Sequence, residues 1–138
     1  MEAKSVARKI GAGTPDMIPR ITIRCSRSRH LFTPSVVENE RLLQELHPGW
    51  RHLFFNHHEA RDWVLENAPE FLELYDFYPV ERQREHLFRW LALRHYGGFW
   101  FATQLRLTES VEALRDTELV LAQQSPLSPE GFLRLHGE

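Results

Sequence analysis

The residues best suited to act on a charged ligand fall in one basic stretch in the second half of the chain. If that stretch is helical, Arg82, His86 and Arg89 share one face, at spacings of four and seven residues. Together with Arg84 they could neutralise a diphosphate without a metal, because guanidinium groups bind phosphate through charge-assisted hydrogen bonds. The alternative is a solvent-facing surface in which Glu85, four residues before Arg89, forms an ion pair with it.

Histidines and the single cysteine are the other candidates for chemistry. His52, His57 and His58 lie close together, but structural zinc sites normally use four ligands, and Glu59 is the only carboxylate beside them. We therefore expect these histidines to belong to a helix start and a surface, with no metal site. Cys25 lies in an alternating stretch without an adjacent base, which indicates packing rather than a nucleophile.

Composition sets outer limits on the function. The chain has 138 residues, 42% of them hydrophobic, which fits one globular domain with a real core. Its net charge of −2 gives no global electrostatic argument for binding nucleic acid or a membrane. No apolar run approaches the ~18 residues of a membrane-spanning helix, and residues 1–17 lack the apolar core of a signal peptide. We expect a cytoplasmic protein, and one cysteine excludes an internal disulfide.

Hydrophobic periodicity predicts the elements that must position these residues. The expected strands are Ile18–Cys25, Trp50–Phe55, Phe99–Leu105 and Glu118–Ala122. The expected helices are Pro34–Leu46, His57–Asn67 with Asn56 as its N-cap, Glu70–Tyr78, Val80–Tyr96 and Glu109–Arg115. Residues 1–17 are expected to form a flexible polar leader, 18–122 the domain and 123–138 a loose tail. The alternation predicts an α/β fold, with helices packed on a sheet.

The end of the expected third strand is the place where such a fold presents a ligand. In α/β sheets, ligands sit at the carboxyl ends of the strands. Here that position is held by Ala102-Thr103-Gln104, which has no charge and no strong metal ligand. Thr103 or Gln104 could still hydrogen-bond to a sugar or a nucleobase. Trp100 and Phe101, just before them, are expected in the core.

Two longer segments carry a family resemblance. PGWRHLFFNHHEARDWVLENAPEFLELYDFYP, followed by RQREHLFRWLALRHYGGFWF, resembles the glycosyltransferase family that has a DXD sugar-binding region. The resemblance covers roughly Ile18 to Ala122, and IPRI at its start matches the opening strand of the family, usually IPKIIH. The order and spacing of the pieces carry the match, rather than any single piece.

The resemblance implies a GT-A-type fold, here a small Rossmann-type half-domain that binds a nucleotide sugar. Such enzymes, mannosyl- and galactosyltransferases among them, move a sugar from a nucleotide donor to a hydroxyl acceptor. A divalent metal, commonly manganese, bridges the protein to the diphosphate of the donor. The metal stabilises the negative charge that grows on the leaving nucleoside diphosphate, and two aspartates one residue apart supply hard oxygen ligands.

This sequence departs from the family pattern at several donor positions. The DXD aligns with Ala102-Thr103-Gln104, so the carboxylate ligands are missing and we expect no bound metal cofactor. The aspartate three residues before the helix arginine is His86, the strand histidine is Ile23, and the arginine itself is kept as Arg89. These changes predict a weakened or inactive hexosyltransferase. The donor-binding candidates are Arg89, His86, Arg84, Ala102, Thr103 and Gln104.

Two alternatives remain open on these residues. The chain could be a non-catalytic module that binds a sugar, a nucleotide or a protein, that is, a pseudoenzyme or a truncated remnant. Alternatively, a second chain could complete the enzyme, with a homodimer or a protein partner covering the exposed side of a shortened sheet. The expected small ligands in an active form are a nucleotide sugar and a carbohydrate acceptor, with no nucleic acid.

Overall fold

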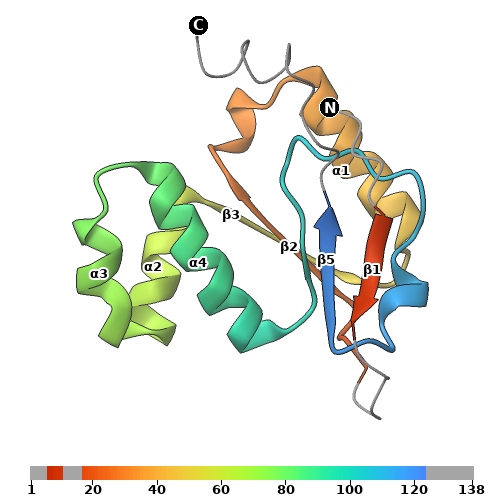
Figure 1. Cartoon of the computed structure of the whole chain (residues 1–138). Coiled ribbons are helices and arrows are strands. Elements are labelled where there is room, and N and C mark those ends of the chain that lie inside the picture. Colours follow the sequence, from red (N-terminus) through yellow and green to blue (C-terminus); the bar gives the residue numbers. More distant parts are fainter. Residues whose placement is uncertain (1–5, 11–16, 124–138) are drawn as a thin grey trace, which may run out of the picture.

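Three parallel strands form the centre of the structure, a computed structural model that describes residues 6–10 and 17–123 (Figure 1). Strand β2 (Ile21–Ser26) lies between β3 (Arg51–Asn56) and β4 (Phe99–Trp100), in the order β3-β2-β4. Helix α1 (Pro34–Leu46) connects β2 to β3, and the remaining helices return the chain past β2 to β4. The chain therefore changes its direction of travel across the sheet between β2 and β4, which is where sheets of this order bind ligands.

One face of the sheet is covered by the helices between β3 and β4 (Figure 1). These are α2 (His57–Asn67), a 3-10 turn (Pro69–Phe71), α3 (Leu72–Phe77) and α4 (Glu81–Tyr96). Their shared core centres on Phe88, which is fully buried. The Phe88 ring meets the rings of Phe55, Trp63 and Trp100 at centroid distances of 5.1, 5.6 and 5.9 Å. Aromatic packing thus fixes α4 against both the sheet and α2.

A second apolar cluster lies on the other face, under α1. Leu43 of α1 packs there with Trp50, Phe99, Phe101 and Leu107. Because successive strand side chains point to opposite faces, Phe99 and Phe101 enter this cluster while Trp100 enters the first one. The two faces together make β2 a fully buried central strand, with Ile23 and Thr22 both at 0% exposure.

Two further strands form a separate antiparallel pair. Strand β1 (Val6–Ile10) pairs with β5 (Leu119–Gln123), with Val6 opposite Gln123 and Ile10 opposite Leu119. Figure 1 shows the pair beside the parallel sheet. The strand expected at Glu118–Ala122 is present as β5, but it pairs with β1 and lies outside the parallel sheet. Strand β1 falls within residues 1–17, which were expected to form a flexible polar leader. Residues 1–5, 11–16 and 124–138 of the expected leader and tail lie outside the described part of the chain.

The expected α/β class is confirmed, and several boundaries are as predicted. The bounds of α1 and α2 agree with the periodicity, and Asn56 caps α2 through a capping box with Glu59. Three expectations on local structure are wrong. Strand β4 ends at Trp100 instead of Leu105, the helix at Glu109–Arg115 is one 3-10 turn (Glu112–Leu114), and that at Glu70–Tyr78 divides into the 3-10 turn and α3.

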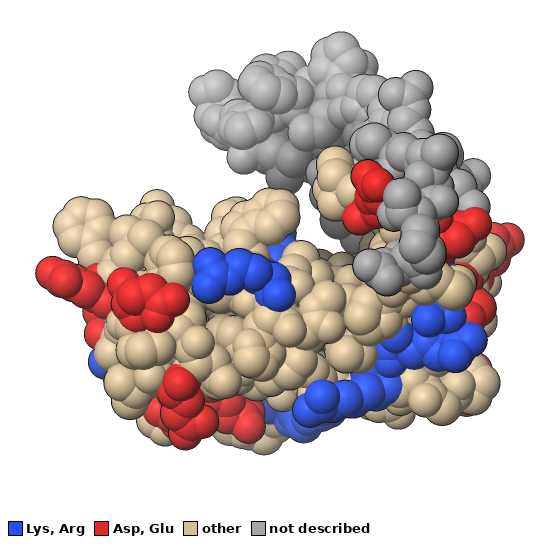
Figure 2. Space-filling view, turned by 90° about the horizontal axis from the view of Figure 1, so that it is seen from below, with Lys and Arg blue, Asp and Glu red and all other residues tan. Residues whose placement is uncertain are grey.

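Charges are mixed over the surface on the side where the parallel strands begin. Figure 2 shows this side, with acidic side chains at the end formed by α2 and α3 and a band of basic ones toward the other end. No helix in the described ranges combines the length and the apolarity that crossing a bilayer requires.

Glu112 joins the 3-10 turn to the start of β2 and gives a prediction on acid stability. Its carboxylate accepts hydrogen bonds from Arg20 (2.7 Å) and Arg115 (2.9 Å). The hydrogen bond from Arg20, joined by that from Arg115, lowers the pKa of Glu112 from 4.5 to about 2 against a smaller desolvation effect. Because the pKa of Glu112 is lower in the folded chain than in the unfolded chain, the ionised carboxylate stabilises the fold at pH values above 4.5. This contribution disappears as the pH falls from 4.5 toward 2.

We expect Glu112→Gln to lower the melting temperature at pH 7 and to leave it almost unchanged near pH 2. Thermal unfolding followed by circular dichroism at both pH values measures this difference. Glu109→Gln is the matched control, since Glu109 is an exposed neighbour for which the described residues provide no ion pair. A loss of equal size at both pH values would show that the carboxylate charge is not what stabilises this corner.

Candidate functional site

The segment expected to face the donor lies at the ligand-binding edge of the sheet. The Phe101 N–H donates to the Ile23 carbonyl at 3.0 Å, which extends the β2–β4 ladder by one bond. The chain then turns, because the Leu105 N–H donates to the Ala102 carbonyl at 3.0 Å. Asn39 of α1 donates to the Thr103 carbonyl at 3.1 Å, and this hydrogen bond ties the turn to helix α1.

The turn does not fit the metal that the family uses. Ala102 presents only a methyl group, and Gln104 offers a neutral amide on an exposed side chain. Thr103 is 3% exposed, and its carbonyl is already occupied by Asn39. A hard divalent cation prefers carboxylate oxygens, and this turn supplies no carboxylate.

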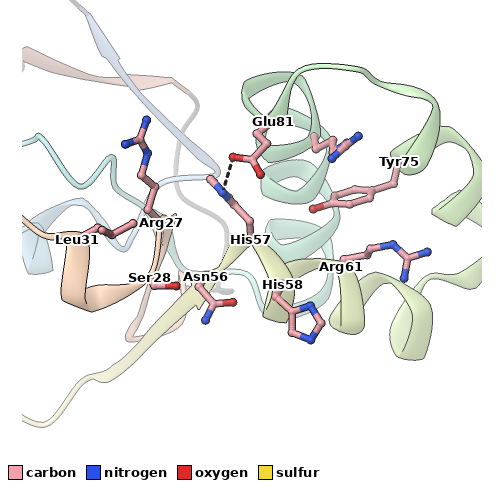
Figure 3. A pocket seen from close by; sticks show the side chains of 10 residues that line it. Arg27, Ser28, Leu31, Asn56, His57, His58, Arg61, Tyr75 and Glu81 are labelled. Carbon is pink, nitrogen blue, oxygen red and sulfur yellow. Dashed lines mark ion pairs between the residues drawn. The ribbon is translucent and has the colours of Figure 1, made fainter.

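An open pocket of about 650 Å³ lies between the ends of β2 and β3 and helices α2 to α4 (Figure 3). Its lining comes from the segment after β2, the end of β3, and helices α2, α3 and α4. The pocket therefore forms only when these parts of the chain pack together. The lining residues are Arg27, Ser28, Leu31, Asn56, His57, His58, Arg61, Tyr75, Glu81 and Arg84.

Basic groups dominate the pocket wall. The Arg84 Nε–H donates to the Tyr78 carbonyl at 2.8 Å, which orients this guanidinium at the wall. Arg61 is held by two hydrogen bonds to Asp76, at 2.9 and 2.8 Å. Burial raises the pKa of Tyr75 to about 12, so its phenol stays neutral and can donate a hydrogen bond. Such a wall suits an anionic ligand with hydroxyl groups.

A buried ion pair supports the end of β2 beneath this edge. Arg24 and Glu40 lie 3.3 Å apart with side chains 5% and 15% exposed, and Arg29 contacts the same carboxylate at 2.5 Å. Burial opposes ionisation of Glu40, but hydrogen bonds and charge from Arg29 and Arg24 outweigh it and lower the pKa. Burial lowers the pKa of Arg24, which Glu40 partly offsets. The network fixes β2 to α1.

The structure separates the arginines and histidine proposed from the sequence. Arg84 lines the pocket, whereas His86 is exposed and is not part of that lining. The Nε of Arg89 is buried without a hydrogen-bond partner, and its guanidinium lies 5.3 Å from the Trp90 ring centroid. Among the described residues no ion pair joins Arg89 to Glu85, so the expected surface pair is not formed.

The three histidines weighed as a group have separate environments. His52 contacts the Thr22 hydroxyl and the His47 carbonyl at 2.7 and 3.2 Å, and burial lowers its pKa. The His58 side chain is 84% exposed. His57 points instead to helix α4, where it meets two glutamates. The sequence showed no sign of this contact, because nothing local reveals which helix packs against the start of α2.

An α/β domain with a ligand edge where the sheet changes direction, and a basic pocket beside it, belongs to the class that binds anionic ligands such as nucleotides. The comparisons give the family. The model described as "Glycosyltransferase sugar-binding region containing DXD motif" matches residues 34–121, more than half of the chain. The chain belongs to this glycosyltransferase family.

Three relatives show where similar sequences occur. The chain is 35% identical over 54 residues to inositol phosphoceramide mannosyltransferase 2 of Schizosaccharomyces pombe, covering 39% of this chain and 16% of the relative. It is 23% identical over 113 residues to mannosyl phosphorylinositol ceramide synthase SUR1 of Saccharomyces cerevisiae, covering 82% and 29%. Inositol phosphoceramide mannosyltransferase 3 of S. pombe is 24% identical over 82 residues, covering 59% and 23%. The matched region spans less than a third of each relative, and no solved structure matches the chain significantly.

Proposed function

We propose that this chain is a GT-A-like, donor-binding glycosyltransferase domain in which metal-dependent sugar transfer is weakened or lost. By family, the reaction would move a sugar from a nucleotide donor to a hydroxyl acceptor. The observation that carries the proposal is the turn at Ala102-Thr103-Gln104. It occupies the ligand edge of a family fold and offers no carboxylate to a metal.

The relatives indicate the chemistry from which the domain comes. Their printed names describe mannosyl transfer to inositol phosphoceramides. The proposal therefore makes a nucleotide sugar the ancestral donor and a hydroxyl of a carbohydrate or glycolipid the acceptor. Without a metal, the charge on a leaving nucleoside diphosphate would have to be stabilised by arginine. Arg89 and Arg84 are the candidates, because the Nε of Arg89 is buried without a hydrogen-bond partner and Arg84 lines the pocket.

A second candidate function is a non-catalytic module that binds a nucleotide or a sugar. The basic pocket favours it, since Arg27, Arg61 and Arg84 surround a cavity of about 650 Å³ that needs no metal to attract an anion. The neutral phenol of Tyr75 adds a hydrogen-bonding group suited to hydroxyls. A protein partner or homodimer and a cytoplasmic location stay predictions.

The release of nucleoside diphosphate from UDP-galactose and GDP-mannose tests the proposal. The full 138-residue chain is incubated with each donor, with and without Mn²⁺, and free UDP or GDP is quantified. We expect no release above that of the buffer, and no effect of Mn²⁺. Release that depends on both the chain and Mn²⁺ would overturn the loss of metal-dependent transfer.

A further inference from the structure

His57, which lines the pocket, belongs to a mixed cluster of metal-ligating side chains that takes no part in the proposed function. Cys25 near the end of β2, His57 at the start of α2 and Glu85 on α4 each bring one ligand atom, and these atoms all lie within 4.8 Å of one another. Cys25 is 7% exposed, and the side chains of His57 and Glu85 are 23% and 27% exposed. The three residues come from three different elements, so the fold itself assembles the cluster.

The His57 ring lies between two carboxylates of helix α4. Its Nδ1 lies 2.8 Å from a Glu81 oxygen and its Nε2 lies 2.7 Å from a Glu85 oxygen (Figure 3 shows the Glu81 contact). A neutral imidazole carries one N–H, so it can donate to only one of two carboxylates. The other nitrogen would then direct its lone pair at an oxygen anion. A second proton on the ring, or a metal ion between Nε2 and Glu85, removes that conflict.

We propose that Cys25 Sγ, His57 Nε2 and Glu85 form a binding site for Zn²⁺. Glu81 is the positioning residue, because it accepts the Nδ1–H and so leaves Nε2 unprotonated and directed at the Glu85 carboxylate. Carboxylates that orient histidine ligands in this way are a regular part of zinc sites. Zn²⁺ binds Cys25 as the thiolate, and the thiol proton is released to solvent.

The observed spacing is close to what zinc requires. With bonds of about 2.0–2.3 Å, a tetrahedral zinc ion holds its ligand atoms roughly 3.3–3.6 Å apart. The Nε2–Glu85 distance of 2.7 Å must open slightly, and the widest separation, at most 4.8 Å, must close by about 1 Å. Rotations of the Glu85 side chain and small shifts of the ring suffice. Three protein ligands leave the fourth position for water or for a molecule in the pocket.

The ligand types exclude manganese as the natural occupant. A thiolate and an imidazole favour zinc-like ions, whereas Mn²⁺ prefers oxygen ligands and binds most weakly of the common divalent ions. The site is therefore no replacement for the carboxylates missing from the DXD position.

Cobalt spectroscopy tests the site directly. The full chain is treated with a chelator, dialysed and titrated with Co²⁺, which substitutes for zinc and absorbs when bound to thiolate. We expect a thiolate-to-cobalt charge-transfer band in the near ultraviolet that added Zn²⁺ abolishes. Because Cys25 is the only cysteine, a band can arise from no other residue. An absent band in the natural chain would overturn the proposal, whatever the outcome of the donor-release assay.

Variants separate the ligands from the surroundings. Cys25→Ser should lose the band, while Glu85→Gln and Glu81→Gln should each weaken binding about 10- to 100-fold. His58→Gln is the matched control, because it changes the adjacent, exposed histidine and should leave the affinity unchanged. Circular dichroism verifies that each variant is folded. If Cys25→Ser unfolds, Glu85→Gln still tests the site, because the Glu85 side chain is partly exposed and its replacement disturbs the core less. Unchanged affinity in Glu85→Gln would contradict the site.

Discussion

Gly98→Ala is expected to destabilise the chain by about 3 kcal/mol or more, a large fraction of the roughly 5–15 kcal/mol that stabilises a typical domain. Gly98 has φ +78°, a conformation that costs a residue with a side chain about 1–2 kcal/mol. In addition, a Cβ placed there would lie 2.5 Å from the Ile21 carbonyl oxygen and 2.9 Å from the Ile21 Cβ. The first of these contacts is with backbone at the start of β2, which cannot move without disturbing the central strand.

Gly49→Ala is the control that isolates the backbone effect. Gly49 has φ +79°, yet a Cβ there would meet nothing within 4 Å. We expect a loss of about 1–2 kcal/mol from conformation alone. Urea unfolding of both variants measures the difference between them. Equal losses of unfolding free energy in the two variants would mean that the close approach of Gly98 to Ile21 does not restrict this turn. The position of Ala102-Thr103-Gln104 would then not depend on that approach.

Glu40→Gln is expected to cost about 3 kcal/mol at pH 7, because it leaves Arg24 buried without its charged partner. The pKa of Glu40 is lowered in the fold, so the carboxylate stabilises the protein above its ordinary pKa, near 4.5, and this contribution is lost as the pH falls below that value. The natural chain and the variant should therefore converge in stability at low pH. Urea unfolding at pH 7 and pH 3 measures both effects.

Glu45→Gln serves as the matched control on the same helix. Its ion pair with Arg41 is exposed, with side chains about half accessible to solvent. Exposed pairs of this spacing contribute about 0.3–0.5 kcal/mol. A loss for Glu40→Gln no larger than that for Glu45→Gln would show that the buried pair does not fix β2 to α1.

The sequence predicted the parts of the fold that depend on local signals. Helix α2 begins where Asn56 and Glu59 form a capping box, and α4 ends at Gly97, which has a positive φ. Such termini depend on neighbouring residues and can therefore be read from a sequence. The predicted strand order placed Ala102-Thr103-Gln104 at the end of the third strand, and the ladder bond from Phe101 to Ile23 shows that the segment follows β4 directly. Its role in facing a ligand stays a prediction.

The remainder depends on contacts between distant segments. The sequence pattern predicts one strand over Phe99–Leu105, but β4 ends at Trp100. A turn that is hydrogen-bonded to Asn39 follows it. The β1–β5 pair joins the two ends of the described chain, which no local pattern can reveal. The same limit explains the zinc cluster, because Cys25, His57 and Glu85 are distant in sequence and gather only when α2 and α4 pack on β2.

The roles of the proposed donor residues stay predictions. The buried, unpartnered Nε of Arg89 supports a role in binding, and Arg84 is oriented at the wall of the pocket. His86 has weaker support, since it is exposed and lies outside the pocket lining. Both arginines can act on a diphosphate without a metal, which is the property that the altered turn would require.

Calorimetry with UDP and GDP, each with and without Mn²⁺, tests the central claim that the carboxylate metal site of the family has been lost. The full chain is compared with the double variant Ala102→Asp and Gln104→Asp, which restores both carboxylates. We expect nucleotide binding by the natural chain to be unaffected by Mn²⁺, and the double variant to gain Mn²⁺-dependent binding. Binding of UDP or GDP by the natural chain that requires Mn²⁺ would contradict the account.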